Sequence, residues 1–490
     1  MLVTKKAKII ELFIISVLTI IGIGSQFFSN LAYSLNQGIL QTSFGIGSKQ
    51  LIIPSIIGNF MFALGVPFGH IFAHKFGTKK IALFFLFSFF IGSIIGILSF
   101  DIFSLSLAKI IQGFSTGILF FTLLPKLFLS FPKRFKNVFL LIVIIGLFGA
   151  NALGGVSGSL SLELDKWKWI FIINIISSLL CFILGVFFIE DDKGTVSRFD
   201  KFNYLPMLFL IFSTIFLTLP MIMITQKSRL DFNMIVFLLI SFLFFVNFVY
   251  TNSKSEDPII FLSSLFHKKP MIGSFMAISS HLTLLTGIAG INVFLMKALK
   301  LPFDITMKFY FFFLLGVIIT GFIKMFFYSS LGAGILGTLG SISILYLTIH
   351  WLTINSNINI HLLYVQGILL RFGTSMTLLS GAMATLLDGD LKYASNRSIT
   401  MHTIRNYLSA ILVPLITYLL STSIQESIQS LYSNYTFTVF NKLVWIKKMQ
   451  DIVIQSDRHI FVLMFIFNLV MLISSIIQII LGKGRRITPK

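Results

Sequence analysis

Residues 167–174 read WKWIFIIN and open an apolar run that continues to residue 189. Two Trp residues ahead of about 20 apolar residues are typical of a helix that enters a membrane at its interface. The whole chain of 490 residues is 56% hydrophobic and 11% charged, with a mean hydropathy of +0.94. Since soluble domains carry about 25% charged residues, this composition excludes a soluble enzyme, a disordered chain and a nucleic-acid-binding module.

Outward from this stretch, apolar runs bounded by charged, Pro or polar clusters predict an all-α polytopic membrane protein with fourteen transmembrane helices. The expected spans are residues 10–33, 50–72, 81–100, 103–127, 138–161, 169–189, 204–224, 234–250, 271–296, 307–327, 334–354, 361–387, 400–420 and 459–481. Only YSSLGA separates the tenth span from the eleventh. The single Cys181 excludes an intrachain disulfide.

The basic residues predict the orientation. The 38 Lys and Arg residues concentrate in the loops that share a side with the N-terminus. By the positive-inside rule, both termini are expected in the cytoplasm and the long loop at 421–458 outside, in a cell inner membrane or plasma membrane. The net charge of +21 follows this pattern and does not form a nucleic-acid-binding stripe.

The loop after the second expected span carries a recognisable motif. The stretch GHIFAHKFGTKK, residues 69–80, is similar to the loop signature of the major facilitator superfamily, G-x-L-A-D-R-x-G-R-K. Lys75, Gly77 and Lys79 match it, Gly69 lies one residue early, and His74 stands in place of the acidic residue. The resemblance implies that these residues help to hold one access state.

Other stretches resemble the fourteen-helix drug:proton antiporter branch of that superfamily, the EmrB/QacA type. WKWIFIIN resembles its helix 6 entry, W-R-W-I-F-L-I-N, and residues 369–379 and 396–407 resemble its helix 12 and helix 13 signatures. LAKIIQGFSTG resembles R-x-x-Q-G-x-G, and GLFGANALGG resembles the antiporter signature G-x-x-x-G-P-x-x-G-G. The matched or substituted positions are Lys109, Gln112, Gly146, Asn151, Gly154 and Gly155.

The resemblance implies a major-facilitator fold with two six-helix bundles, at residues 1–190 and 257–490. Two additional helices would lie within residues 191–256. It also implies alternating access to a site near the membrane midplane. The small residues of GLFGANALGG have a second reading, because small residues at helical spacing also allow two helices to pack closely.

Acidic residues avoid the expected spans. Sixteen of the 17 fall in loops, and Glu11 lies at the inner edge of the first span. Proton-coupled members of the family carry an Asp in helix 1, whereas the matching stretch SQFFSNLAYSL has Ser25 there and retains Asn30. With no carboxylate deep in a span, elimination leaves His281 and His402 as coupling candidates, because imidazole changes charge near neutral pH.

Basic residues do enter the spans. Lys109, Arg371 and Arg405 lie inside them with no acid available, so each is expected to face water, a carbonyl group or an anion. Lys324, near an inner helix end, is expected to reach the membrane surface. The expected cavity-lining residues are Asn30, Lys109, Gln112, Asn151, Arg371 and Arg405.

The function these features favour is secondary export of small amphipathic or toxic compounds. An anionic solute, such as a carboxylate metabolite or a siderophore, is the alternative cargo, because the cavity has cations and no acid. An integral-membrane transferase is disfavoured, because no cluster of catalytic or metal-binding residues is visible. The expected partners are a small molecule and the lipid bilayer, with protons and a periplasmic adaptor protein as further candidates, and no cofactor or nucleic acid.

Overall fold

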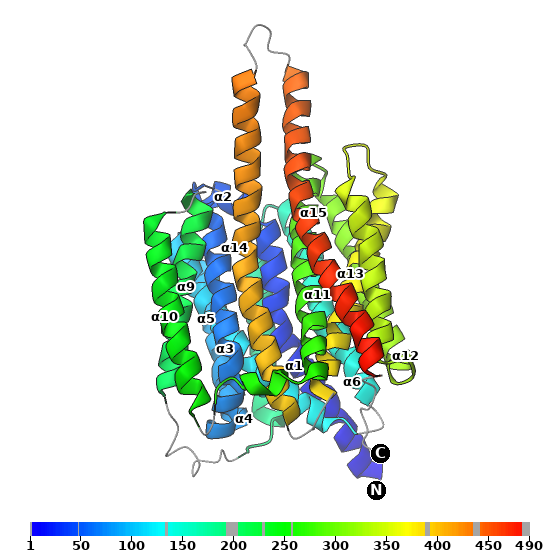
Figure 1. Cartoon of the computed structure of the whole chain (residues 1–490). Helices are drawn as coiled ribbons and strands as arrows, with labels where there is room; N and C mark the ends of the chain where they lie inside the picture. Colours follow the sequence, from blue (N-terminus) through cyan, green and yellow to red (C-terminus); the bar gives the residue numbers. More distant parts are fainter. Residues whose placement is uncertain are drawn as a thin grey trace.

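The computed structural model describes residues 2–47, 49–132, 136–192, 204–227, 231–255, 258–387, 393–434 and 442–482. Within these ranges the chain is all-helical and has no strand. Thirteen helices among the described residues are long and apolar enough to cross a membrane. Figure 1 shows them side by side, with the start of α1 and the end of α15 on the same side of the bundle.

The helices fall into groups by their packing. The N-terminal group is α1 (Leu2–Leu35), α3 (Ile53–Phe76), α4 (Thr78–Leu98), α5 (Ile102–Ser130), α7 (Gly149–Glu163) and α8 (Trp169–Phe188). The C-terminal group is α11 (Lys268–Val293), α12 (Phe303–Leu352), α13 (Ile360–Leu387), α14 (Ala394–Asn434) and α15 (Lys442–Leu481). The short α2 (Gln37–Phe44) and η1 (Gln50–Ile52) link α1 to α3.

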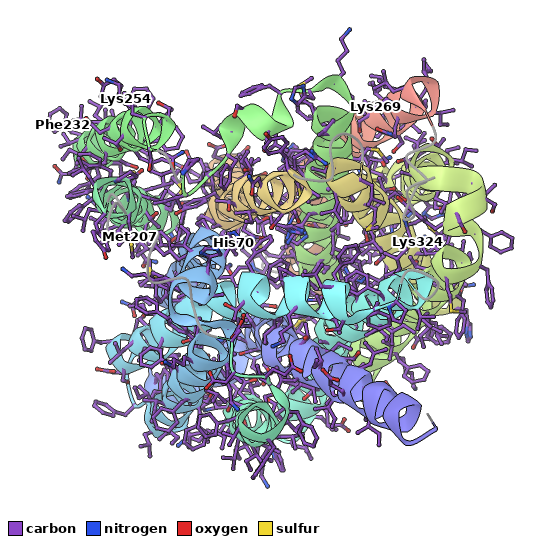
Figure 2. The ribbon with its side chains drawn as sticks, turned by 90° about the horizontal axis from the view of Figure 1, so that it is seen from below. His70, Met207, Phe232, Lys254, Lys269 and Lys324 are labelled. Carbon is purple, nitrogen blue, oxygen red and sulfur yellow. The ribbon has the colours of Figure 1, made fainter. Side chains whose placement is uncertain are left out.

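Two helices stand apart from both groups. α9 (Leu205–Lys227) and α10 (Phe232–Ser253) pack on each other, and α9 also contacts α3 and α14. Figure 2 shows this pair at one edge of the bundle, marked by Met207 on α9 and Phe232 on α10. They are the two additional helices that the sequence predicts. The boundaries at 190/191 and 256/257 remain predictions, and residue 256 lies outside the described ranges.

Two of the described helices contain a wide π-helical turn. α6 (Lys136–Val143) continues through η3 (Ile144–Phe148) into α7, and α11 continues into η6 (Phe294–Ala298). π-turns inside longer helices often occur at functional sites because they change the hydrogen-bond pattern of the backbone.

The long helix α12 contains two of the fourteen expected spans, and Gly332 is the point at which one ends and the next begins. It lies inside α12 with φ 80° and ψ 177°, a conformation that only Gly adopts readily. Both arms of α12 pack on α13, since Gly316 faces the Ile368 carbonyl and Gly340 faces the Gly373 carbonyl. A straight helix would separate those glycines by about 36 Å and the two carbonyls by about 7.5 Å. α12 therefore folds back at Gly332, which confirms the two spans expected around YSSLGA.

The last two long helices extend beyond the others. α14 and α15 continue past the rest of the bundle on the side opposite the termini (Figure 1). The Ser423 and Ser456 hydroxyls lie 3.1 Å apart between them. Most of the expected loop at 421–458 is thus helical, and α14 and α15 extend beyond the predicted spans 400–420 and 459–481.

We expect Gly332→Ala to lower the free energy of unfolding by about 1–3 kcal/mol, because a Cβ is strained at this φ and ψ. Gly47→Ala is the control, since nothing lies within 4 Å of a Cβ at Gly47. Unfolding in mixed detergent micelles measures both variants. Equal stability of Gly332→Ala and Gly47→Ala would contradict a sharp turn at Gly332.

Candidate functional site

Glycines in the continuous helix α6–η3–α7 let it pack closely on α1 of the N-terminal group and on α12 of the C-terminal group. A Cβ at Gly154 would lie 2.3 Å from the Phe28 carbonyl oxygen of α1, and one at Gly146 would lie 2.4 Å from Ile20. On the other side, a Cβ at Gly155 would lie 2.3 Å from the Tyr310 ring of α12. These positions need glycine for close packing. Their part in conformational change remains a prediction.

The loop between α3 and α4 obtains a carboxylate from elsewhere in the chain. Gly77 has φ 91° and separates the two helices. The Asp192 carboxylate accepts hydrogen bonds from the Thr78 hydroxyl at 2.5 Å and from the Lys79 N–H at 3.3 Å. An acid at the start of a helix satisfies free N–H groups and complements the helix dipole. Asp192, just after α8, thus provides an acid in a loop motif where His74 replaces the usual one.

Two other residues of this loop motif have separate roles. Lys75 donates to the Tyr204 hydroxyl at 2.5 Å, next to the start of α9. Gly69 lets α3 approach α5, because a Cβ there would lie 2.2 Å from the Ile118 carbonyl oxygen.

Amide side chains form a polar chain inside the N-terminal group. The Gln26 amide donates to Asn30 at 3.2 Å, and the Asn30 amide donates to Asn59 at 3.0 Å. Asn151 donates to the Phe27 carbonyl at 3.3 Å, and its own side-chain oxygen is buried without a partner. Asn30 of α1 thus bonds to α3, and Asn151 bonds to the backbone of α1.

Lys109 of α5 is 1% exposed and packs within the same group. Its ammonium donates to the Ser29 hydroxyl at 3.0 Å and lies 4.9 Å from the centroid of the Tyr33 ring. Gln112, one turn along, donates to Ser93 at 2.9 Å, and its side-chain oxygen has no partner. Lys109 is therefore held by a hydroxyl and by cation–π contact.

Arg371 of α13 joins the two groups. Its guanidinium donates to the Phe148 carbonyl at 3.0 Å and lies 4.8 Å from the Phe148 ring centroid. Phe148 is the last residue of η3, in the helix that carries Gly146, Gly154 and Gly155. The Arg371 Nε is buried without a partner. The Nε–H group of this buried guanidinium is therefore a hydrogen-bond donor without an acceptor.

A cationic cluster surrounds this junction, and we define it as His281, Arg371, His402 and Arg405. Arg371 and Arg405 lie near enough to His281 to influence it electrostatically, and Arg405 and His281 lie near enough to His402 to do the same. His402 packs on Phe120 and Phe121 of α5, with ring centroids 5.1 and 5.6 Å away.

The polar atoms of this cluster are only partly satisfied. Arg405 donates to Asn406 at 3.3 Å, while its Nε and the His402 Nδ1 are buried without a partner. Of the predicted cavity residues, the structure brings Arg371 and Arg405 together with the two predicted histidines. It places Asn30, Lys109, Gln112 and Asn151 among the helices of the N-terminal group.

Two expectations about charged residues were wrong. Lys324 is 0% exposed and donates to the Ser380 hydroxyl, so it does not reach the membrane surface. Asp457, expected in a loop, is 0% exposed within the membrane-length part of α15. It lies on the same face as Ile454, Phe461 and Met464, so its spacing in the apolar stripe was the signal for burial.

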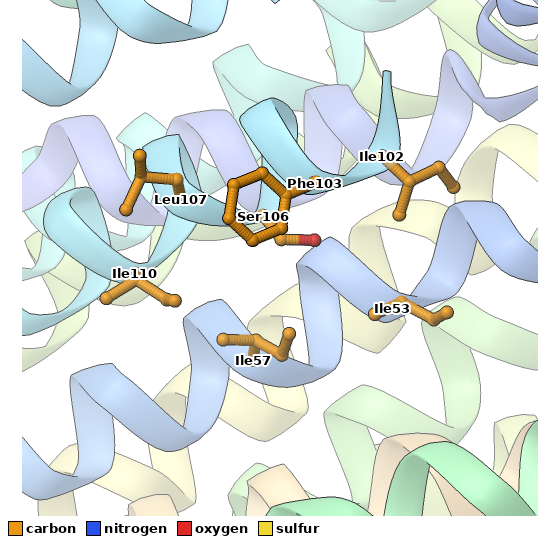
Figure 3. Close-up of a pocket in the computed structure, with 7 residues that line it drawn as sticks. All are labelled: Ile53, Ile57, Ile102, Phe103, Ser106, Leu107 and Ile110. Atoms are coloured by element: carbon orange, nitrogen blue, oxygen red, sulfur yellow. The ribbon is translucent and has the colours of Figure 1, made fainter.

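An apolar groove of about 450 Å³ lies between α3 and α5. Figure 3 shows the side chains that line it, which are Ile53, Ile57, Ile102, Phe103, Ser106, Leu107 and Ile110. None of the predicted site residues lines this groove, so it is separate from the cationic cluster.

Membrane-length helices in two groups, with buried polar side chains at their junction, define a polytopic membrane transport protein. The sequence matches the Major Facilitator Superfamily over residues 12–414, and the chain belongs to this family. It is a transporter and not an enzyme.

Relatives with full-length and partial similarity agree with this class. The uncharacterized MFS-type transporter YubD of Bacillus subtilis (strain 168) is 24% identical over 435 residues, covering 87% of this chain and 85% of the relative. The multidrug efflux pump SdrM of Staphylococcus aureus (strain N315) is 31% identical over 136 residues, covering 26% of this chain and 29% of SdrM.

Among solved structures, the proton:xylose symporter XylE, bound to 6-bromo-6-deoxy-D-glucose, has a TM-score of 0.54 at 12% identity. The similarity covers 91% of this chain and 94% of XylE. At this identity the likeness shows the shared fold, which confirms the predicted fold class.

The pKa of Asp192 gives a test of its role. Partial burial acts to raise the pKa, but hydrogen bonds from Thr78 and Lys79 and the charge of Lys126 outweigh it and lower the pKa below its ordinary value. A lowered pKa contributes stability above the ordinary value, and that stability is lost as pH falls through the lowered one.

We expect Asp192→Asn to lower the melting temperature at pH 7. The difference from the wild type should become smaller as the pH falls below about 3.9, because the Asp192 carboxylate then begins to take up a proton. Thermal melting of the purified protein measures this, and the exposed neighbour Asp191 provides the control variant Asp191→Asn. A difference that is the same at both pH values would contradict a role for the Asp192 charge.

Proposed function

We propose that this chain is a secondary active exporter of small amphipathic compounds, of the fourteen-helix drug:proton antiporter branch. The match of WKWIFIIN to that branch and the multidrug efflux pump among the partial relatives support the proposal. We further propose residues 1–190 and 257–490 as the two moving bundles and residues 191–256 as the linker with its two helices.

Alternating access would occur at the junction of the two groups. There α7 packs on α12 through Gly155, Arg371 donates to the Phe148 carbonyl, and His402 packs on α5. Each of these contacts joins the N-terminal group to the C-terminal group. Rocking of one bundle against the other must break or change them, as in other transporters with a site between repeats.

The alternative cargo, an anionic amphipathic solute, is favoured by one observation. Arg371 and Arg405 are 3% and 4% exposed, each has an Nε without a partner, and neither forms an ion pair in the part of the chain that the structure describes. A buried charge without a counter-ion is costly. A carboxylate, sulfate or phosphate group on the cargo would supply the missing charge, and Arg can bind it in a bidentate manner.

The coupling and the location are also proposals. His281 and His402 lie in the cationic cluster, so proton uptake there would change the charge that an anion meets. We propose an inner or plasma membrane location with cytoplasmic termini, which places the α14–α15 hairpin outside. A periplasmic adaptor protein would then meet that hairpin.

Orientation is tested with single cysteines in a Cys181→Ser background. Asp451→Cys on the hairpin should react with a membrane-impermeant thiol reagent in intact cells, whereas Asp191→Cys should react only after permeabilisation. Both positions are exposed side chains at opposite ends of the bundle. The reverse labelling pattern would contradict cytoplasmic termini.

Cargo charge is tested with a matched pair of probes, naphthoate and naphthylmethylammonium. Naphthoate should raise the melting temperature of the purified protein more than the cation does, because binding to the folded state stabilises it. Arg405→Gln should weaken naphthoate binding by about tenfold or more, which is the loss of one hydrogen bond to a charged group.

Lys324→Gln is the control for that experiment, because Lys324 is equally buried but outside the cationic cluster. Equal stabilisation by the two probes, or equal losses in the two variants, would contradict an anionic cargo. Export itself is measured as uptake of the preferred probe into inside-out vesicles.

A further inference from the structure

A buried carboxylate lies in the part of α15 on the side opposite the termini. Asp457 is 0% exposed, and neither of its oxygens has a hydrogen-bond partner. Its neighbour Arg458 donates instead to the Ile354 carbonyl at 2.8 Å, just beyond the end of α12. Asp457 therefore lies level with the ends of the surrounding helices, inside their packing.

The surroundings of Asp457 are apolar. Phe461, one turn along α15, packs on Trp351 with ring centroids 5.1 Å apart, and both side chains are fully buried. Ile454, one turn before Asp457, is also buried. Along its length α15 packs on α11, η6, α12, α13 and α14.

Charged and titratable groups on those elements do not pair with Asp457. They include Lys297 on η6 and Lys300 after it, Asp304, Lys308 and His350 on α12, His361 on α13, Glu426 on α14, and Asp451, Arg458 and His459 on α15. The same helices also carry Lys268, Lys269 and His281 on α11, Lys324 on α12, Arg371 on α13, Arg397, His402 and Arg405 on α14, and Lys447 and Lys448 on α15. Lys308 pairs with Asp304, and His350 contacts Gln366. None of the groups named here forms an ion pair or a hydrogen bond with Asp457.

An ionised carboxylate in such a site would lack every source of stabilisation that water provides. Transferring an unpaired charge into an apolar environment is so unfavourable that the group becomes neutral instead. Asp457 can stay buried here as a carboxylic acid, and it would ionise when movement of α15 or η6 admits water. Burial of the Asp457 side chain is therefore coupled to protonation of its carboxyl group.

We propose that Asp457 is a proton-binding site through which the transporter takes up a proton from the side opposite its termini. The carboxylate accepts a proton from that aqueous phase as α15 closes against α11 and η6, and after the two groups rock it releases the proton toward the side of the termini. The Ser423 hydroxyl lies 3.1 Å from the Nδ1 of the exposed His459 and 3.1 Å from the Ser456 hydroxyl, so polar groups accompany α15 up to the residue before Asp457. The inference adds a carboxylate to the two histidines and rests on the proposed function only for its use in coupling.

The protonation state is tested without any substrate, by infrared spectroscopy of the purified full-length protein at neutral pH. We expect the carbonyl band of a neutral carboxylic acid, shifted in heavy water, in the wild type. Asp457→Asn should remove it, and Asp451→Asn, an exposed Asp on the same helix, should retain it. Absence of the band from the wild type overturns the proposal even if Asp457→Asn does not fold, and so does a band that persists in Asp457→Asn.

The coupling role is tested in proteoliposomes with an imposed pH gradient. Asp457→Asn should abolish the response of transport to the gradient while naphthoate still raises the melting temperature as in the wild type. A gradient response that survives in Asp457→Asn overturns the coupling role. Loss of naphthoate stabilisation from the wild type itself would instead contradict the anionic cargo and leave the infrared result intact.

Discussion

A positive charge buried among membrane helices needs a partner, and for Lys109, Lys324 and Arg371 the partners that the structure describes are neutral. Lys109 binds the Ser29 hydroxyl and lies over Tyr33, Lys324 binds the Ser380 hydroxyl, and Arg371 binds a backbone carbonyl. Hydroxyl groups, carbonyl oxygens and aromatic rings lower the cost of burial without cancelling the charge. The helices that supply these groups are therefore held in their relative positions, and the bundle retains an excess of positive charge.

One of these buried positive charges, Arg371, lies where the two groups of helices meet. The Arg371–Phe148 bond joins α13 to the helix that carries Gly146, Gly154 and Gly155, at a π-turn where the backbone hydrogen-bond pattern changes. Under the proposed function, the carboxylate of an anionic cargo molecule would be a stronger acceptor for Arg371 than the Phe148 carbonyl oxygen and could replace it. Binding of an anion and loosening of the junction would then be linked, because the same guanidinium serves both.

Asp192 and Asp457 are both outside the sequence motifs, so the motifs did not indicate their roles. Asp192 caps α4 from a position more than a hundred residues away in the sequence, and it supplies an acid where the loop motif has His74. Asp457 is enclosed by apolar neighbours near the end of the bundle opposite the termini. Hydrogen bonds from Thr78 and Lys79 stabilise Asp192 as an anion, whereas Asp457 has no hydrogen bond, so two identical side chains lie in opposite environments.

The sequence alone determined the membrane location, the fourteen spans and the family, because a hydrocarbon environment restricts a chain to apolar helices of a fixed length. It also identified the glycines of α7 and the cations within the spans. Only the tertiary structure decided which of those cations meet, that α12 reverses at Gly332, and that Lys324 and Asp457 are buried. Those outcomes depend on which helix faces cover one another, and contacts between residues far apart in the chain leave little trace in local composition or periodicity.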